Sequence, residues 1–312
     1  MRGKKNEMKT TPIRIKTISD FHQFRGLPTP QHPLISIINF DELEEMQVTE
    51  NLSWLMDFYS ISMKRIPNAK FKYGQHTSDF NNGVLFFMAP HQVLSIELDA
   101  ENPTKPSGWF LLIHPDFLYG TSLAKKIHQY EFFDYAVHEA LFLSGKEEQT
   151  LNAIIQNIQQ EYHANIDKFS QQIIVSQLET LLNYSERFYE RQFITRKKVN
   201  NEILERLEDL LQAHFNRKDL AIIGLPSVNK LAEDLNVSPN YLSGLLKSLT
   251  GQSTQQIIHE QLIEKAKEKL STTNLTVSEI AYELGFEQPQ SFSRMFKNKT
   301  NQTPLEFREA FN

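Results

Sequence analysis

The C-terminal part of the chain contains one pattern twice, and this internal repeat restricts the possible folds more than any other feature. The segment VNKLAEDLNVSPNYLSGLLKSLTGQST, which starts at Val228, aligns with VSEIAYELGFEQPQSFSRMFKNKTNQTP, which starts at Val277. The offset is 49 residues and becomes 50 after one extra residue in the second turn. Self-similarity of this kind indicates one supersecondary unit that is used twice.

Each copy is predicted to be two short helices joined by a tight turn, at residues 227–250 and 276–300. In the second copy, Thr276 and Glu279 form a T-x-x-E capping box, which satisfies backbone N–H groups at a helix start. Gly285 follows the apolar residues of this helix, where a left-handed helix end favours glycine. Pro289 suits the first turn of the next helix, because its missing N–H has no helical partner there.

The second helix of this copy has two chemically different faces. Its inward face is expected to bury Phe292, Met295 and Phe296. Its polar face carries Gln290, Ser291, Arg294 and Lys297. In the major groove of DNA, Arg reads guanine and Gln reads adenine, while Lys neutralises phosphate. The helix therefore suits the major groove, and the alternative is a helical hairpin with a solvated polar face.

Between the two copies, apolar residues recur every fourth position over residues 254–270, which predicts a single helix. A helix of about 17 residues spans about 25 Å. A rod of that length can hold two recognition helices in successive major grooves, which lie about 34 Å apart.

Residues from about 200 to 312 resemble the DNA-binding domain of the AraC (AraC/XylS) family of bacterial transcription regulators. The tail pattern GF-x4-SFSRMFK-x3-NQTPLEFR is nearly the complete signature of that family. The resemblance implies base contacts by Gln290, Ser291 and Arg294 in the second motif. In the first motif it implies base contacts by Asn240 and Ser243. Lys247 and Lys297 are then expected to face phosphates.

The first motif departs from the family pattern at Gly244, where the family usually carries a base-reading Arg. Glycine also costs about 1 kcal/mol inside a helix. Asn301 replaces a usual Gly, but Asn tolerates the left-handed conformation. We therefore expect the first motif to dock by shape and phosphate contact, and the second to read the sequence.

The charge of this domain is close to neutral. From Lys218 onward there are ten Lys and Arg residues against eleven acidic ones. DNA-binding domains usually carry a basic surface. Arg294, Lys297 and Lys299 nevertheless cluster on the second recognition helix, and most acidic residues fall on the other helices.

The 312 residues correspond to about two domains, so an α+β multidomain protein is expected. Residues 20–121 are rich in β-branched and aromatic residues, with strands predicted at 34–40, 52–63, 83–89, 92–98 and 108–113. Short strands at this spacing indicate a small β-barrel or jelly roll. The family resemblance implies a cupin-like sensor domain at this place. The basic residues 1–16 are interpreted as a solvated, frayed tail.

The β domain offers aromatic residues but no metal-binding pattern. His76, His91 and His114 stand alone, without the His-x-His pair of metal-dependent cupins, so we expect no metal, no cofactor and no catalysis. A group of aromatic residues either lines a ligand pocket or forms plain core. They are Trp54, Phe58, Tyr59, Phe71, Tyr73, Phe86, Phe87, Trp109 and Phe110.

Residues 122–193 are predicted to be a helical segment. Ser144 and Glu147 form another capping box and open a helix that reaches about Tyr162. A longer helix is expected at 167–193, with a 4-3-4-3 apolar seam. The seam consists of Ile174, Leu178, Leu181, Ser185 and Phe188. It either packs against its own domain or forms a dimer contact, which the resemblance favours. Residues 194–200 are interpreted as a linker and 201–312 as the DNA-binding domain.

The resulting expectation is a sequence-specific DNA-binding transcription regulator, controlled by a small molecule bound in the β domain. Its expected partners are double-stranded promoter DNA, RNA polymerase and a second copy of the chain. Two alternatives are an effector-free regulator whose β domain is a dimerisation scaffold, and a cupin-type enzyme fused to a DNA-binding tail. No run of 18 apolar residues and no signal peptide is present, so a cytoplasmic protein without a membrane span is expected. The absence of Cys excludes thiol redox sensing.

Overall fold

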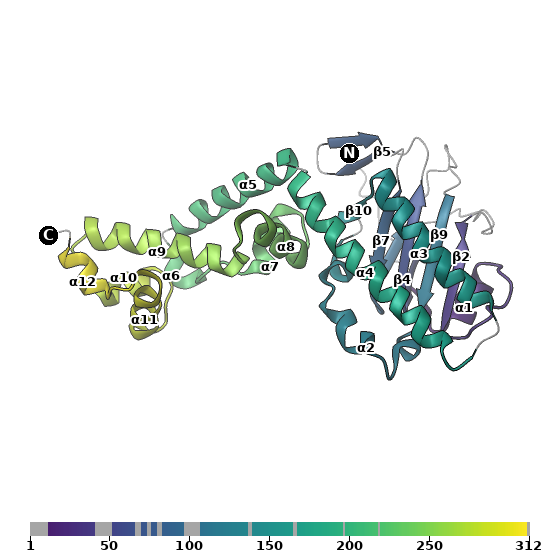
Figure 1. The fold of residues 1–312 in the computed structure, drawn as a ribbon. Coiled ribbons are helices and arrows are strands. Elements are labelled where there is room, and N and C mark those ends of the chain that lie inside the picture. The colour runs from purple at the N-terminus through teal and green to yellow at the C-terminus, as the bar shows by residue number, and fades with distance from the viewer. Residues whose placement is uncertain are drawn as a thin grey trace, which may run out of the picture. The chain divides into compact units, whose positions relative to one another are not determined.

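The computed structural model describes the chain in ten stretches. They are residues 12–40, 52–65, 70–73, 76–79, 83–96, 107–136, 139–164, 167–195, 197–217 and 219–310. The chain divides into two compact units, Met1–Gln192 and Phe193–Asn312. The first contains all the β-strands described, and the second is helical (Figure 1).

The first unit is built around a five-stranded antiparallel sheet with the order β10-β7-β4-β9-β2. Its strands are β2 (Ile35–Asn39), β4 (Tyr59–Arg65), β7 (Val84–Met88), β9 (Ser107–Ile113) and β10 (Leu141–Phe142). A smaller sheet has the order β1-β3-β8, with β1 (Ile13–Ile15), β3 (Leu52–Met56) and β8 (Val93–Ile96). Strands β5 (Lys70–Tyr73) and β6 (His76–Asp79) pair as a two-stranded sheet.

Helices cover one face of the five-stranded sheet. Helices α3 (Gly145–His163) and α4 (Ser170–Thr195) lie across this face in Figure 1. Trp109 of β9 donates from its indole Nε1 to Oδ1 of Asn152 in α3, at 2.9 Å. Arg65 of β4 forms an ion pair of 2.6 Å with the buried Glu148 of the same helix. These contacts fix α3 against the sheet.

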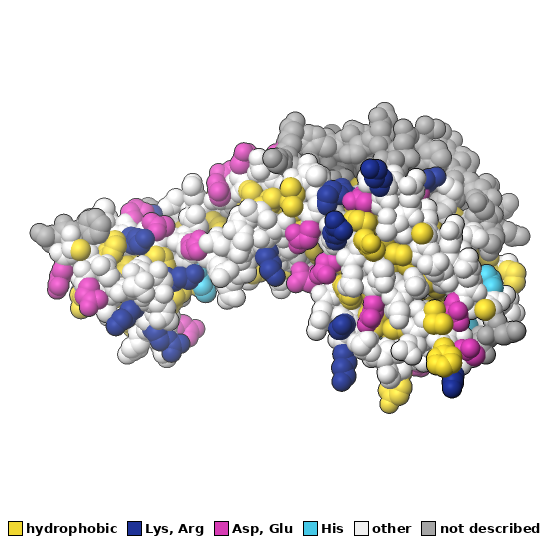
Figure 2. Space-filling view, in the orientation of Figure 1, with side chains coloured by type: hydrophobic (Ala, Val, Ile, Leu, Met, Phe, Trp, Pro, Cys, Tyr) yellow, Lys and Arg dark blue, Asp and Glu magenta, His cyan; other side chains and the backbone are white. Residues whose placement is uncertain are grey.

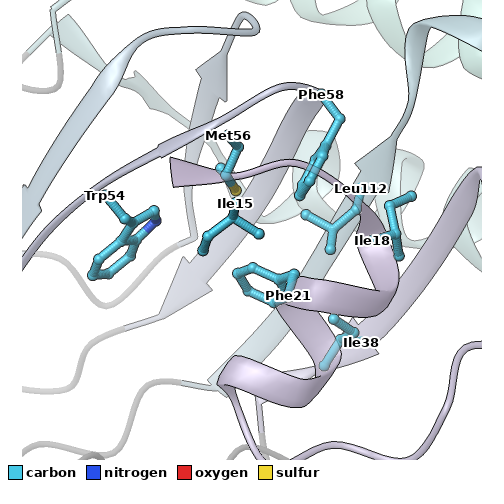
Figure 3. Packing of buried hydrophobic residues seen from close by; sticks show 8 residues of the cluster. All are labelled: Ile15, Ile18, Phe21, Ile38, Trp54, Met56, Phe58 and Leu112. Carbon is cyan, nitrogen blue, oxygen red and sulfur yellow. The ribbon is translucent and has the colours of Figure 1, made fainter. Parts of the chain in front are cut away.

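The other face of this sheet packs against the smaller sheet and α1 (Ile18–Phe24). Ile38 and Leu112 supply the five-stranded sheet's share of this core, and the remaining side chains come from β1, β3, α1 and the turn after β3 (Figure 3). They are Ile15, Ile18, Phe21, Trp54, Met56 and Phe58. The five-stranded sheet is therefore a middle layer that is buried on both faces.

The prediction of a closed barrel is wrong for the described strands, which form separate open sheets, whereas the jelly roll stays a prediction. The predicted strand 52–63 breaks at Asp57 and Phe58 into β3 and β4, and the two halves join different sheets. Five successive residues of β4, from Tyr59 to Met63, are buried. In a barrel, the outer face of this sheet would be open to water. Here the outer face of the five-stranded sheet carries apolar residues, and helices α3 and α4 cover it (Figure 1). A cupin-like architecture stays a prediction.

The interpretation of residues 1–16 as a frayed tail is also wrong for residues 13–15. Residues 13–15 form β1, which pairs in parallel with Trp54–Met56 of β3. The Nε–H of Arg14 is shared between the two carboxylate oxygens of Asp57, at 3.0 and 3.2 Å, and its Nη2 donates to Asp57 Oδ2 at 2.9 Å. Residues 1–11 lie outside the described part of the chain.

The helical part of the first unit begins with short turns and continues with α3 and α4. The capping box at Ser144 is confirmed, because the Ser144 N–H donates to Glu147 Oε2 at 2.7 Å. All five residues of the α4 seam are buried within the single chain, with exposed fractions of 0–7%. The seam is thus covered by its own chain, and a contact between two copies would need other residues of α4.

The helical unit contains eight helices after residue 196, all within the described residues. They are α5 (Lys197–Phe215), α6 (Leu220–Ile223), α7 (Val228–Leu235), α8 (Pro239–Thr250), α9 (Thr254–Thr272), α10 (Val277–Glu283), α11 (Pro289–Thr300) and α12 (Pro304–Glu309). The expected single helix between the repeats is α9, which at 19 residues spans about 28 Å. The predicted linker 194–200 is mostly helical, since α4 ends at Thr195 and α5 begins at Lys197.

Among the described residues, none of the helices combines the length and the apolar character needed to cross a bilayer.

Candidate nucleic-acid interface

The corner between α10 and α11 is fixed by local interactions that the sequence predicts. The Thr276 N–H donates to Glu279 Oε2 at 2.7 Å, and the Glu279 N–H donates to Thr276 Oγ1 at 3.2 Å. Gly285 has a φ of +85°. A Cβ at this position would lie 3.0 Å from Cα of Gly224 and 3.1 Å from the carbonyl oxygen of Leu220. Glycine is therefore required by both the backbone conformation and the close approach of the chain around α6.

Aromatic packing holds the back of α11. Phe292 and Phe296 are fully buried, and their ring centroids lie 5.8 Å apart. Phe286 of the turn packs on Phe292 at 5.4 Å, and Phe307 of α12 packs on Phe296 at 5.6 Å. Met295, which was expected to be buried with them, is half-buried and borders a hollow on the surface.

The front of α11 is polar and open to solvent. All four predicted contact residues of this helix are exposed, namely Gln290, Ser291, Arg294 and Lys297. A hollow of about 750 Å³ lies between α10 and the start of α11. Another hollow, of about 440 Å³, is bordered by Ser291, Arg294, Met295, Asn298 and Lys299. The polar face of α11 thus stands as a ridge between two hollows.

The lysines of the supporting helices are neutralised by neighbouring acids. In α7, Lys230 pairs with Glu233 and Asp234. In α9, three lysines pair with carboxylates at 2.6–2.8 Å. They are Lys265, Lys267 and Lys269.

The cations of the recognition helices differ from these lysines. Within the described residues, no carboxylate lies at ion-pair distance from Lys247 of α8 or from the three cations of α11. Those three are Arg294, Lys297 and Lys299. Figure 2 shows Lys and Arg side chains gathered over α11. The near-neutral total therefore conceals positive charge on this helix that forms no ion pair within the described residues, although Glu306 of α12 acts electrostatically on Lys297.

The α7–α8 motif has helix caps like those of the α10–α11 motif, but fewer of its predicted contact residues are exposed. Ser227 and Ser238 cap the two helices, and Asn236 ends α7 with a φ of +55°. Lys247 is exposed, whereas Asn240 is half-buried.

Ser243 is the other predicted base contact of this motif, and its hydroxyl lies close to α9. Its Oγ lies 3.3 Å from Oγ1 of the buried Thr254 at the start of α9, and Ser243 is half-buried. Gly244 adds no side chain. The structure thus exposes more of the predicted contact residues on α11 than on α8.

Sequence reasoning missed the residues of α10 that border the larger hollow. Tyr282 is 51% exposed there, and Ser278 lies one turn earlier. Both residues lie outside the buried apolar stripe, which consists of Ile280 and Ala281 of α10 and the next residue after the helix, Leu284. A helical wheel of this short helix would have identified them as surface residues next to the turn.

The histidines and aromatic residues singled out in the β domain have individual surroundings. His91 Nδ1 lies 3.2 Å from Asp57 Oδ1, and His114 Nδ1 lies 3.5 Å from Asp116 Oδ2. Most of the nine aromatic residues are core: five of them are at most 6% exposed. Phe86 and Phe110 are half-buried. The side chains of His76, Phe71 and Tyr73 lie outside the described part.

Comparison with known proteins gives matches in the helical unit. Residues 231–310 match a family model described as a helix-turn-helix domain. An uncharacterised HTH-type transcriptional regulator of Staphylococcus aureus is 29% identical over 147 residues, which are 47% of this chain and 18% of that protein. This chain therefore covers less than a fifth of that relative's length.

Solved structures give similar local matches. The C-terminal domain of AraT, a response regulator from Geobacillus stearothermophilus, is 33% identical over 35% of this chain and 84% of that chain, with a TM-score of 0.31. A transcriptional regulator from Chromobacterium violaceum with an AraC-type DNA-binding domain is 23% identical over 36% of this chain and 93% of that chain, with a TM-score of 0.32.

Proposed function

We infer that this chain, whose residues 231–310 form a helix-turn-helix domain of the AraC type, is a sequence-specific DNA-binding regulator of transcription. One observation carries the proposal. The exposed front of α11 combines side chains suited to reading bases with cations that form no ion pair with a described carboxylate, while the lysines of α7 and α9 are paired. Charge of this kind is available to phosphate.

In the proposed complex, the ridge of α11 enters the major groove. Arg294 has the donor geometry to bind guanine, and Gln290 can pair with adenine. Lys297 and Lys299 face the phosphates, and the two hollows beside the ridge receive the sugar-phosphate strands. The exposed hydroxyl of Tyr282 is placed beside the larger hollow, where it can donate to a phosphate.

The first motif is proposed to position the protein more than to read sequence. Helix α9 joins the two motifs and, at about 28 Å, is close to the groove repeat of about 34 Å. Lys247 is free to contact phosphate. Ser243 already has a neighbour in Thr254, and Gly244 has no group with which to read a base.

We place regulation in the β unit, through a small-molecule effector that favours one arrangement of the two units over another. The regulator is proposed to bind promoter DNA as a homodimer. It would then change either the access of RNA polymerase to the promoter or its own contact with RNA polymerase. The alternative is an effector-free regulator whose β unit serves as a dimerisation scaffold. A ligand that raises the melting temperature of the whole chain would favour the first of these.

The experiment is selection of binding sites from random duplex DNA with the full chain, followed by affinity measurements on the selected duplex. Arg294→Ala should weaken specific binding by about 1–3 kcal/mol, roughly 5- to 150-fold, and relax the preference at one base pair. Arg217→Ala is the matched control, because Arg217 is exposed but paired with Asp219 at 2.7 Å. No enriched sequence for the wild-type chain, or equal effects of the two variants, would refute the proposal.

A further inference from the structure

Met295 of α11 lies partly on the surface, although the apolar pattern of the helix predicts that it is buried. Phe292 and Phe296 on either side of it are fully buried, whereas Met295 is half-buried. The construction of the motif does not require this exposure. Leu245 occupies the equivalent position in the first motif, and it is fully buried in α8. Part of the Met295 side chain is therefore available to a group outside the chain.

Met295 borders the smaller of the two hollows beside the polar front of α11. This hollow, of about 440 Å³, is lined by Ser291, Arg294, Met295, Asn298 and Lys299. Ser291 precedes Met295 by four residues and Asn298 follows it by three, so the three side chains lie along one stripe of the helix. Met295 is the apolar member of a stripe that is otherwise polar.

The neighbours of Met295 determine which part of DNA meets it in the proposed complex. Ser291 and Arg294 are proposed to contact bases, and Lys299 is proposed to face a phosphate. All three residues are exposed. Because Met295 borders the same hollow as these residues, it is placed where the edges of the bases meet the sugar-phosphate strand.

The chemistry of the Met295 side chain restricts the group that it can recognise. A thioether carries no charge and is only a weak hydrogen-bond acceptor, so it suits neither a phosphate nor the polar atoms of a base edge. The apolar group that base pairs present in the major groove is the C5-methyl of thymine. This methyl group lies at the outer side of the base edge, next to the sugar-phosphate strand of its own thymine. An unbranched Met side chain can adapt its shape to such a group.

We propose that Met295 reads thymine, by packing against the C5-methyl group of a thymine that neighbours the bases contacted by Ser291 and Arg294. This contact deepens the proposed function, on which it rests. It adds an apolar specificity residue to a helix whose other proposed base contacts are polar. Leu245 is buried at the equivalent position of α8, so the first motif has no such contact.

The test is fluorescence anisotropy of the full chain with the selected duplex, in which each thymine in turn is replaced by uracil. Uracil keeps the base pair and the hydrogen-bonding groups of thymine and lacks only the methyl group. At one thymine of the site, uracil should weaken binding of the wild-type chain about fourfold, the factor that corresponds to one buried methyl group. Met295→Ala should bind the thymine and uracil duplexes equally.

Leu210→Ala is the matched control. Leu210 is also apolar and half-buried, but it belongs to α5, outside both motifs. This variant should keep the fourfold difference between thymine and uracil. Because each variant is compared with itself on two duplexes, a general loss of stability cancels. The proposal is overturned if no thymine responds to the replacement in the wild-type chain, or if Met295→Ala responds as strongly as the wild type.

Oxidation of methionine to its sulfoxide, located by mass spectrometry of peptides, reports on the same contact without an affinity measurement. In the free chain, hydrogen peroxide should oxidise Met295 faster than the buried Met56 and Met63. Saturation with the selected duplex should protect Met295. A Met295 that is as reactive in this complex as in the free chain would overturn the proposal.

These experiments separate the inference from the proposed function. Sequence-specific binding that does not distinguish thymine from uracil refutes the Met295 contact alone. If no duplex is enriched from random DNA, the proposed function fails, and the thymine contact fails with it.

Discussion

At the scale of single residues, Gly285 occupies the tightest point of the recognition motif. Gly285→Ala should lower the free energy of unfolding by about 2–3 kcal/mol, because a side chain is strained at a φ of +85° and its Cβ would press on backbone atoms of Leu220 and Gly224. Gly251→Ala is the control, since Gly251 has a φ of +74° but open space around its Cβ. It should cost about 1 kcal/mol. Urea unfolding measures both, and equal losses would contradict the role of the contact.

Lys297 should act on DNA through its charge alone. Lys297→Ala is expected to weaken binding to all DNA sequences to a similar extent and to reduce the slope of log K against log salt concentration by about 1. Lys230→Ala should leave the slope nearly unchanged, because Glu233 and Asp234 already neutralise Lys230. Affinity measurements at several salt concentrations give the slope for each variant. An unchanged slope for Lys297→Ala would remove Lys297 from the phosphate contacts.

Lys64 should make stability depend on pH in the alkaline range. Removal from water and then repulsion by Arg25 lower its pKa from 10.5 in an unfolded chain to about 8 in the folded one, so between these values the unfolded chain holds more protons. Stability from this group therefore rises with pH from about 8 to 10.5, and below 8 the full cost of the charged form of this half-buried lysine is present. The stability difference between wild type and Lys64→Met should narrow by on the order of 2 kcal/mol over this range. Denaturant unfolding at pH 7, 8, 9 and 10 measures it, and a constant difference would contradict the lowered pKa.

At the scale of elements, sequence patterns predicted best the features that depend on neighbouring residues. The capping boxes at Ser144 and Thr276 lie within one helical turn, so their sequence alone determines the hydrogen bonds. Helix α9 follows from its own apolar spacing. The left-handed ends at Gly285 and Asn301 were expected for the same reason, with φ values of +85° and +60°.

The elements that the sequence did not reveal depend on partners far along the chain. Strand β1 has three residues and exists because it pairs with Trp54–Met56 in the smaller sheet. The predicted strand 52–63 breaks at Asp57 and Phe58 because its first half, β3, joins the smaller sheet and its second half, β4, joins the five-stranded sheet. The same limit applied to the interface. The composition predicts a helical domain with a total charge close to zero. It does not show which cations are paired with acids, because pairs such as Lys269 and Glu283 join residues that are far apart in the sequence.

At the scale of the whole molecule, the division into two units falls between Gln192 and Phe193, inside α4. Gln192 belongs to the β unit, because its side chain accepts from the Phe142 N–H and donates to the Ala140 carbonyl oxygen. Phe193 belongs to the helical unit, where its ring lies 5.2 Å from that of the buried Tyr241. One continuous helix therefore carries a residue that packs within each of the two units.

This assignment predicts where the DNA-binding unit can be separated. A fragment of residues 193–312 should unfold cooperatively and bind the selected duplex, whereas a fragment of residues 201–312 should be less stable by about 3 kcal/mol. The shorter fragment lacks Phe193, which is 2% exposed, and leaves a cavity beside Tyr241. It also lacks Asn200, whose side chain donates to the Phe193 carbonyl oxygen. Phe193→Ala in the longer fragment should reproduce most of the loss, and Ile194→Ala, at a neighbour that is 53% exposed, should not. If both fragments unfold at the same urea concentration, the helical unit begins after α4, and Phe193 plays no part in it.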